Sequence, residues 1–133
     1  MTHDEFVKKY NDIVERALTF AKKARREGLL ALDEEADQDR IDERDIFEYG
    51  IRFVVDGTHA EIVEKILSNI IKQEKDENML ILKTIQKEAA LSIQAGDNPR
   101  MMYHLLNSYT DITLKEDEIK KLIEDLNERP IVL

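Results

Sequence analysis

The sequence predicts an all-α protein, a compact bundle of about six helices that forms a single domain over residues 1–133. Charged residues make up 37% of the chain and hydrophobic residues 42%, with only four Gly and two Pro. This composition favours helices over strands and turns. Apolar side chains recur at steps of three and four along most of the chain, which is the spacing of one helix face. A chain of this length can bury one core but is too short to divide comfortably into two domains.

The first predicted helix begins near Thr2, because Thr2 and Glu5 have the spacing of a capping box. Its apolar face is formed by Phe6, Tyr10, Ile13, Ala17, Ala21 and Ala24. Four cations follow in the last turns, where they meet the negative end of the helix dipole: Lys22, Lys23, Arg25 and Arg26. Gly28 marks the expected end of this helix or a close packing point.

Residues 33–45 carry eight acidic side chains and only two arginines. Because the segment has almost no apolar side chains to bury, we expect an acidic, solvated loop or a frayed helical turn. A calcium loop is excluded by its spacing. Counted from Asp33, Gln38 stands where the loop requires glycine, and Arg44 stands where it requires a bidentate glutamate.

Two helices are predicted after the acidic segment. The first is short, carries Phe47, Gly50, Ile51 and Val54, and ends at Asp56-Gly57. A second capping box, Thr58 and Glu61, starts the next helix. That helix has a wide apolar stripe, so we expect it to pack centrally: Ile62, Val63, Ile66, Leu67, Ile70 and Ile71.

Residues 72–78 are polar and form either a helix extension or a joint. A fourth helix is predicted from about Met79 to Gly96, with a buried face of Leu82, Ile85, Ala89 and Ile93. Asp97 is the expected cap of a fifth helix, with Pro99 in its first turn and an apolar side of Met101, Met102, Leu105 and Leu106. A third capping box, Thr113 and Glu116, predicts a last helix that ends before Pro130.

Composition also limits the partners and the location of the chain. The net charge of −9 repels phosphate backbones and anionic headgroups, so we expect no nucleic acid and no membrane surface as a partner. The chain has no cysteine, which excludes disulfides and thiolate metal sites. Its longest apolar runs span four residues, whereas a membrane helix needs roughly 20. We therefore expect a cytoplasmic protein that does not span the membrane.

Catalytic signatures are missing from the sequence. His3, His59 and His104 lie on separate predicted elements without partners at metal-ligand spacing. There is no nucleophile elbow, P-loop or glycine-rich dinucleotide turn. Without an apolar pocket that raises one pKa, the many carboxylates are expected to stay solvated charges. We therefore expect no enzyme, no metal and no cofactor.

Three segments, in order along the chain, resemble the flagellar stator A subunit. Residues 24–33, ARREGLLALD, resemble the ARxxGLLALE signature on the cytoplasmic helix that leads away from the second membrane span of that family. Residues 49–57, YGIRFVVDG, resemble its G-x-x-x-x-V-D-G segment. Residues 89–100, AALSIQAGDNPR, resemble the motif G-I-x-x-I-Q-x-G-x-N-P-R that follows the fourth span. Two membrane spans separate the last two segments in the family, whereas here only residues 72–78 join them. The resemblance is therefore to the cytoplasmic part, without the channel.

The resemblance also implies a binding surface. In the family, an arginine and the signature glutamate are the charges implied in gripping the rotor switch protein, and they correspond here to Arg25 and Asp33. Eight residues apart, these two share a helix face if the helix continues through Gly28. Together with neighbouring charges they give the candidate partner-binding residues Lys22, Arg25, Arg26, Asp33 and Glu34.

Two functions follow as hypotheses. The first is a stator-like interaction module that binds the rotor switch complex or the stator subunits of the bacterial flagellar motor. The alternative is a general helical regulatory module that kept the fold and forms a homo-oligomer through the Ile62 to Ile71 stripe or through Met101 and Met102. A chain joined from two cytoplasmic segments is less natural, because Met1 and a capped first helix open the sequence.

Overall fold

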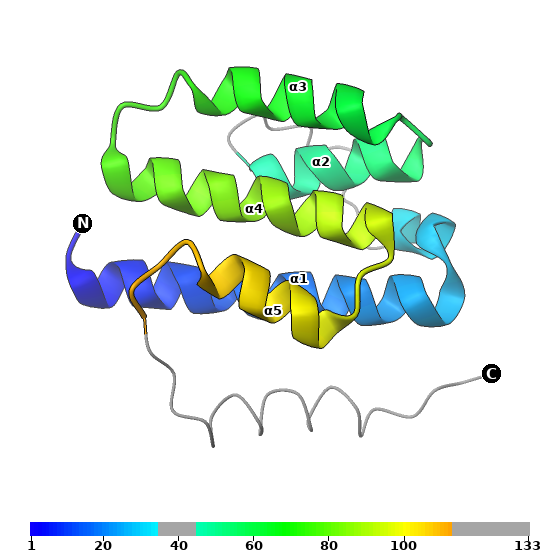
Figure 1. Ribbon diagram of the computed structural model, residues 1–133, viewed down its shortest axis with the longest axis horizontal. Coiled ribbons are helices and arrows are strands. Elements are labelled where there is room, and N and C mark those ends of the chain that lie inside the picture. Colours follow the sequence, from blue (N-terminus) through cyan, green and yellow to red (C-terminus); the bar gives the residue numbers. More distant parts are fainter. Residues whose placement is uncertain (35–44, 113–133) are drawn as a thin grey trace.

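The computed structural model describes residues 1–34 and 45–112. These residues contain six helical elements and no strand, which confirms the all-α prediction (Figure 1). The last predicted helix, after Thr113, lies outside the described residues. The elements are α1 (His3–Glu27), the 3-10 helix η1 (Leu29–Glu34), α2 (Ile46–Val55), α3 (Ala60–Ile71), α4 (Glu77–Ala95) and α5 (Pro99–Asn107).

Helix α4 is the centre of the bundle and packs against α1, α2, α3 and α5. The predicted buried face of α4 is confirmed, and Ala90 and Ser92 are buried beside it. The expectation that the helix after Gly57 packs centrally is wrong. This helix, α3, packs mainly against α2 and α4 and buries Val63, Leu67 and Ile71, while Ile62 is 48% exposed. Its wide stripe is therefore only partly used inside the protein.

Gly50 lets α2 approach α4 and α3 closely. A Cβ atom at this position would lie 2.8 Å from the Cβ of Ala90 and 3.1 Å from Cδ1 of Leu67. Both distances are shorter than ordinary van der Waals contacts between carbon atoms. A side chain at position 50 would therefore force these helices apart.

The cap of α1 agrees with the sequence prediction, whereas the cap of α3 differs from it. The backbone N–H of Glu5 donates to Oγ1 of Thr2 at 3.1 Å, as the first capping box predicts. At α3, however, the cap is His59, with no side-chain hydrogen bond. Thr58 instead closes α2, because its N–H donates to the carbonyl of Phe53 at 3.0 Å.

The predicted cap of α5 is also shifted by one residue. Asn98 rather than Asp97 accepts the cap hydrogen bond, from the N–H of Arg100 at 2.8 Å. The carboxylate of Asp97 instead accepts a hydrogen bond from Oγ of Ser92 at 2.8 Å. Asp97 thus holds the end of α4, not the start of α5.

Only the two ends of the acidic segment are among the described residues, because residues 35–44 lie outside them, so the expected solvated loop or frayed helical turn stays a prediction there. Asp33 and Glu34 belong to η1. Asp45 caps α2 through the N–H of Glu48 and also lies 3.2 Å from Arg16. Arg16 contacts Glu48, which is buried, at 3.2 Å as well, and its guanidinium lies over the ring of Phe47 at 5.0 Å. One cation on α1 therefore fixes the start of α2.

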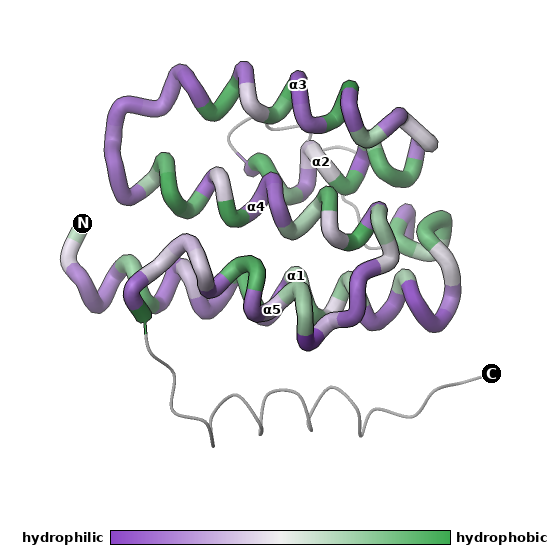
Figure 2. The backbone as a smooth tube through the Cα atoms, in the orientation of Figure 1, coloured by the Kyte–Doolittle hydropathy of each residue, from purple (hydrophilic) through white to green (hydrophobic). Residues whose placement is uncertain are grey.

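The segment between α3 and α4 is a loop and not a helix extension, because α3 ends at Ile71 and α4 begins at Glu77. It is the continuous hydrophilic turn at one end of the molecule in Figure 2. The Glu74 carboxylate accepts hydrogen bonds from the N–H groups of Lys75 and Asp76 and pairs with Lys83 at 3.0 Å. The loop is thus held to α4 by charge.

Candidate partner-binding surface

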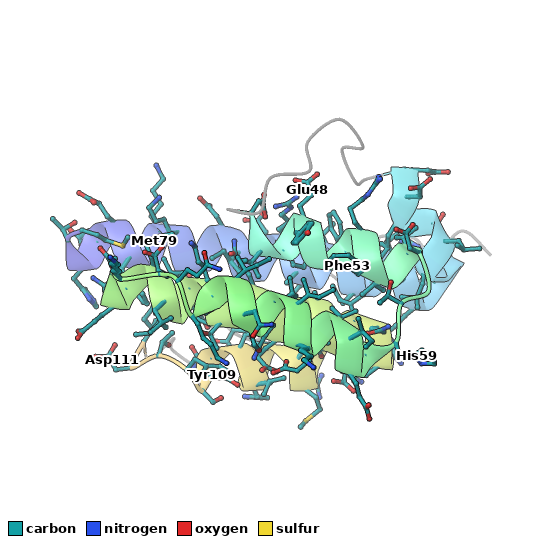
Figure 3. All side chains as sticks on the ribbon, turned by 90° about the horizontal axis from the view of Figure 1, so that it is seen from above. Glu48, Phe53, His59, Met79, Tyr109 and Asp111 are labelled. Carbon is teal, nitrogen blue, oxygen red and sulfur yellow. The ribbon has the colours of Figure 1, made fainter. Side chains whose placement is uncertain are left out.

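The three segments that resemble the stator subunit meet at one end of the bundle. This end gathers the end of α1, η1, the turn before α3 and the end of α4 (Figure 1). Figure 3 shows His59 at this end, with Met79, Tyr109 and Asp111 toward the opposite end. We define the motif end as residues 25–34, 56–59 and 94–98.

Arg25 joins the first segment to the third. Its side chain is exposed, and its Nη1 donates to the carbonyl of Gly96 at 3.1 Å. Gly96 ends α4 in the left-handed conformation, with φ of 75°. The last carbonyls of a helix lack intrahelical partners and carry the negative end of its dipole, so a guanidinium satisfies both needs there. Arg25 therefore has a structural role besides any contact with a partner.

Gln94 joins the third segment to the residue that directly follows the second segment, Thr58. Its Nε2 donates to the carbonyl of Thr58 at 2.7 Å, in the turn between α2 and α3. This bond spans 36 residues of sequence. The first and third segments are thus joined directly, and the third is joined to the turn after the second, in each case by a side-chain donor on a backbone carbonyl.

The five candidate residues lie close in sequence to the turn between α1 and η1. Glu34 is exposed and pairs with Lys23 at 3.3 Å, and Arg26 pairs with Glu27 at 3.6 Å. Lys22 is half-buried and Asp33 is exposed. Of the five candidate residues, Arg25, Asp33 and Glu34 are therefore exposed to solvent, whereas Lys22 and Arg26 are partly buried.

Arg25 and Asp33 do not share one continuous helix face. α1 ends at Glu27, and Gly28 turns the chain with φ of 90° before η1 begins. A side chain at this φ would be strained, which is why glycine ends the helix here. The two charges are instead carried by two different elements on either side of the turn.

Sequence reasoning did not single out Leu30, which is 76% exposed at the motif end. Leu32 in the same element is fully buried, and Leu29 packs against the core. In a 3-10 helix, side chains three residues apart eclipse each other. Leu29 and Leu32 therefore point inward together, and Leu30 and Asp33 point outward together. The sequence signal that could have pointed to Leu30 is the apolar run of residues 29–32, which is too short to form one face of a helix.

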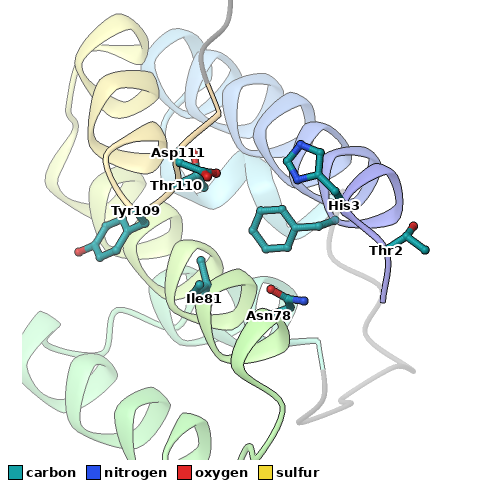
Figure 4. A pocket seen from close by; sticks show the side chains of 8 residues that line it. Thr2, His3, Asn78, Ile81, Tyr109, Thr110 and Asp111 are labelled. Atoms are coloured by element: carbon teal, nitrogen blue, oxygen red, sulfur yellow. The ribbon is translucent and has the colours of Figure 1, made fainter.

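The opposite end of the bundle carries an open hollow of about 420 Å³. The N-terminal turns of α1 and α4 and the segment after α5 line it: Thr2, His3, Phe6, Asn78, Ile81, Tyr109, Thr110 and Asp111 (Figure 4). Figure 4 shows the ring of Tyr109 turned away from His3 and Asn78. None of the five candidate residues lines this hollow.

A metal-binding cluster and a membrane-spanning helix are both missing from the part of the chain that the structure describes. No group of three or more His, Asp or Glu side chains there is arranged to hold a metal ion. No helix within residues 1–34 or 45–112 combines the length and the apolar character needed to cross a bilayer.

The chain is similar in sequence to motility protein A of two Treponema species. It is 35% identical over 81 residues to motility protein A of Treponema pallidum (strain Nichols), and 36% identical over 81 residues to motility protein A of Treponema phagedenis. Each match covers 61% of this chain and 30% of the relative. No family model and no solved structure matches the sequence. The chain therefore spans less than a third of the curated relatives it matches, and the similarity supports a relationship to motility protein A.

Proposed function

We propose that this chain is a non-enzymatic interaction module of the bacterial flagellar motor. In this proposal the motif end binds a cytoplasmic motor component, either the rotor switch protein or the stator subunits. The observation that carries it is that three stator-like segments reach one end of the bundle, where Arg25 bonds to Gly96 and Gln94 bonds to Thr58, the residue after the second segment. The similarity to motility protein A supports the same conclusion.

The charges at the motif end suit a protein partner. Arg25 and Arg26 lie before the turn at Gly28, while Asp33 and Glu34 lie after it. A partner with the reverse order of charges meets both patches at once, which fixes its register and speeds its association. Such contacts weaken with salt, because exposed charges are screened. We therefore expect binding to be strongest at low ionic strength.

The test is a titration of the purified chain with the rotor switch protein and, separately, with stator subunits, at two salt concentrations. Arg25→Glu and Asp33→Lys should each weaken binding about 5–10-fold at low salt and less at high salt. Lys9→Glu and Asp12→Lys are the matched controls, because these exposed residues make the same charge changes nearer the start of α1. The controls should bind like the wild type.

Arg25→Glu also removes the hydrogen bond to Gly96, so the free energy of unfolding should be measured for each variant. A loss of about 0.5–1.5 kcal/mol is expected for that bond, which leaves the chain folded. Unchanged affinity of both reversal variants would place the motor-binding surface elsewhere. Absence of binding by the wild type would overturn the proposal itself.

Self-association is the alternative function, and two exposed apolar side chains favour testing it. Ile62 on α3 is 48% exposed and Met101 on α5 is 63% exposed. However, Met102 and half of the α3 stripe are buried inside the protein. Sedimentation equilibrium of the wild type and of Ile62→Glu and Met101→Glu separates the two functions. If the wild type is a dimer and either substitution makes it a monomer, the alternative is favoured.

A further inference from the structure

We infer that Leu30 is the apolar anchor of the motif end, and that it inserts into a shallow apolar pocket on the protein partner. This inference rests on the proposed function and names what the partner must offer. Leu30 is the most exposed of the large hydrophobic side chains in the described residues, at 76%. It lies between the charges that the proposal already assigns to binding.

The position of Leu30 is fixed by the packing of its own short element. Leu32 is fully buried, Leu29 packs against the core, and Glu34 at the end of η1 pairs with Lys23 on α1. The N–H of Ala31 donates to the carbonyl of Gly28 at 3.2 Å, which closes the turn. A side chain held on a fixed turn loses little conformational freedom when it is covered, so its burial contributes more to affinity.

Leu30 differs in this respect from the other exposed apolar side chains. Ile62 and Met101 lie on regular helices, where one side of an amphipathic stripe reaches the surface. Isolated exposed apolar side chains of that kind are common and need no partner. Leu30 is instead on the outer side of η1 together with Asp33, because side chains three residues apart eclipse in a 3-10 helix.

The surrounding charges define the partner. Arg25 lies before the Gly28 turn and Asp33 lies beside Leu30, and both are exposed. A complementary surface therefore has an apolar pocket with an acidic side chain on the Arg25 side and a basic side chain on the Asp33 side. A side chain that enters a well-packed pocket, surrounded by contacts that exclude water, has the geometry of an interface hot spot. Charge gives the register, and Leu30 gives affinity that does not depend on salt.

The experiment compares Leu30→Ala with Met101→Ala in titrations against the rotor switch protein and against the stator subunits, at low and high salt. Leu30→Ala should weaken binding about 30-fold, and equally at both salt concentrations, because the lost contact is apolar. Arg25→Ala should weaken binding mainly at low salt. Met101→Ala should bind like the wild type, although its side chain is exposed to a similar extent.

The outcomes separate this inference from the proposed function. If the wild type binds and Arg25→Ala weakens binding while Leu30→Ala does not, the motif end binds its partner without an apolar anchor and this inference is wrong. If Met101→Ala is the variant that weakens binding, the anchor lies on α5 instead. If the wild type binds neither protein, the proposed function fails and the inference fails with it.

Discussion

The two ends of the bundle are held together by different chemistry. At the motif end, the long-range bonds are made by a guanidinium and an amide donating to backbone carbonyls, Arg25 to Gly96 and Gln94 to Thr58. In the loop at the other end and in the middle of α3, carboxylates make the contacts to α4, through Glu74 with Lys83 and Glu64 with Lys87. Neither donor at the motif end depends on the protonation of a carboxylate. These two bonds should therefore persist under conditions that weaken the ion pairs of Glu74 and Glu64, although Glu34 with Lys23 and Asp97 with Ser92 also bring carboxylates to the motif end.

The small apolar cluster between α2, α3 and α4, which contains Leu67, should show the largest effect. Leu67 on α3 is fully buried, while Ile62 on the same helix is 48% exposed. Leu67→Ala should lower the free energy of unfolding by about 2–5 kcal/mol, because it removes buried methyl groups and leaves a cavity. Ile62→Ala should change it much less. The measurement is urea unfolding of both variants, and equal losses would mean that α3 does not face the core as described.

Gly50 tests the close approach of α2 to α4, and the effect should be smaller. A methyl group at this position meets Ala90 at 2.8 Å. Gly50→Ala should lower the free energy of unfolding by about 1–3 kcal/mol through overpacking, although alanine is the better helix former. Ala90→Gly in the same chain should restore part of the loss, because it removes the atom that clashes. A Gly50→Ala variant more stable than the wild type would contradict the close packing.

The smallest effect is a difference in pH dependence between the two ends. Desolvation by burial raises the pKa of Glu64, but hydrogen bonds from Lys87 and Ser68 outweigh it and leave the pKa below its usual value. The hydrogen bond from Lys83 is the main cause of the lowered pKa of Glu74, with the N–H of Asp76 contributing as well. A carboxylate with a lowered folded pKa stabilises the fold above its unfolded pKa, and this stabilisation is lost as pH falls through the folded pKa.

The test is urea unfolding of Lys87→Met and Gln94→Ala between neutral pH and about pH 3. At neutral pH the Glu64–Lys87 pair should contribute about 0.2–1 kcal/mol, because Glu64 is 46% exposed. The difference between the wild type and Lys87→Met should shrink as Glu64 becomes protonated. The difference between the wild type and Gln94→Ala should stay constant over the same range. A Gln94→Ala difference that also shrinks would show that the motif end depends on carboxylates too.

Much of the fold could be predicted from local sequence. Thr2 with Glu5, the glycines at 28, 57 and 96, and the apolar spacing of α1 and α4 locate helix ends and buried faces. The predictions that failed were those in which either of two adjacent residues could cap a helix. Asp97 and Asn98 are both good caps, and Ser92 decides between them by engaging Asp97. Such a decision depends on a residue brought near by the fold, which a local pattern does not contain.

The candidate site was predictable in its charges but not in its geometry. Residues 24–33 drew attention through their resemblance, yet nothing in the sequence shows that Arg25 reaches Gly96, 71 residues away. The shared helix face expected for Arg25 and Asp33 required helix through Gly28, and the positive φ of Gly28 prevents it. The exposure of Leu30 could not be predicted from the apolar run that contains it. Leu30 faces outward because the chain changes from α-helix to 3-10 helix at this point.

The central claim is that the motif end, and not the end with the loop of residues 72–76, meets the motor. The most direct measurement is amide hydrogen exchange of the whole chain, alone and saturated with the rotor switch protein or with stator subunits. We predict slower exchange on binding in residues 29–34, 56–59 and 96–98, with residues 72–76 unchanged. Slower exchange confined to residues 72–76 or to α5, or no change with either protein, would contradict the claim.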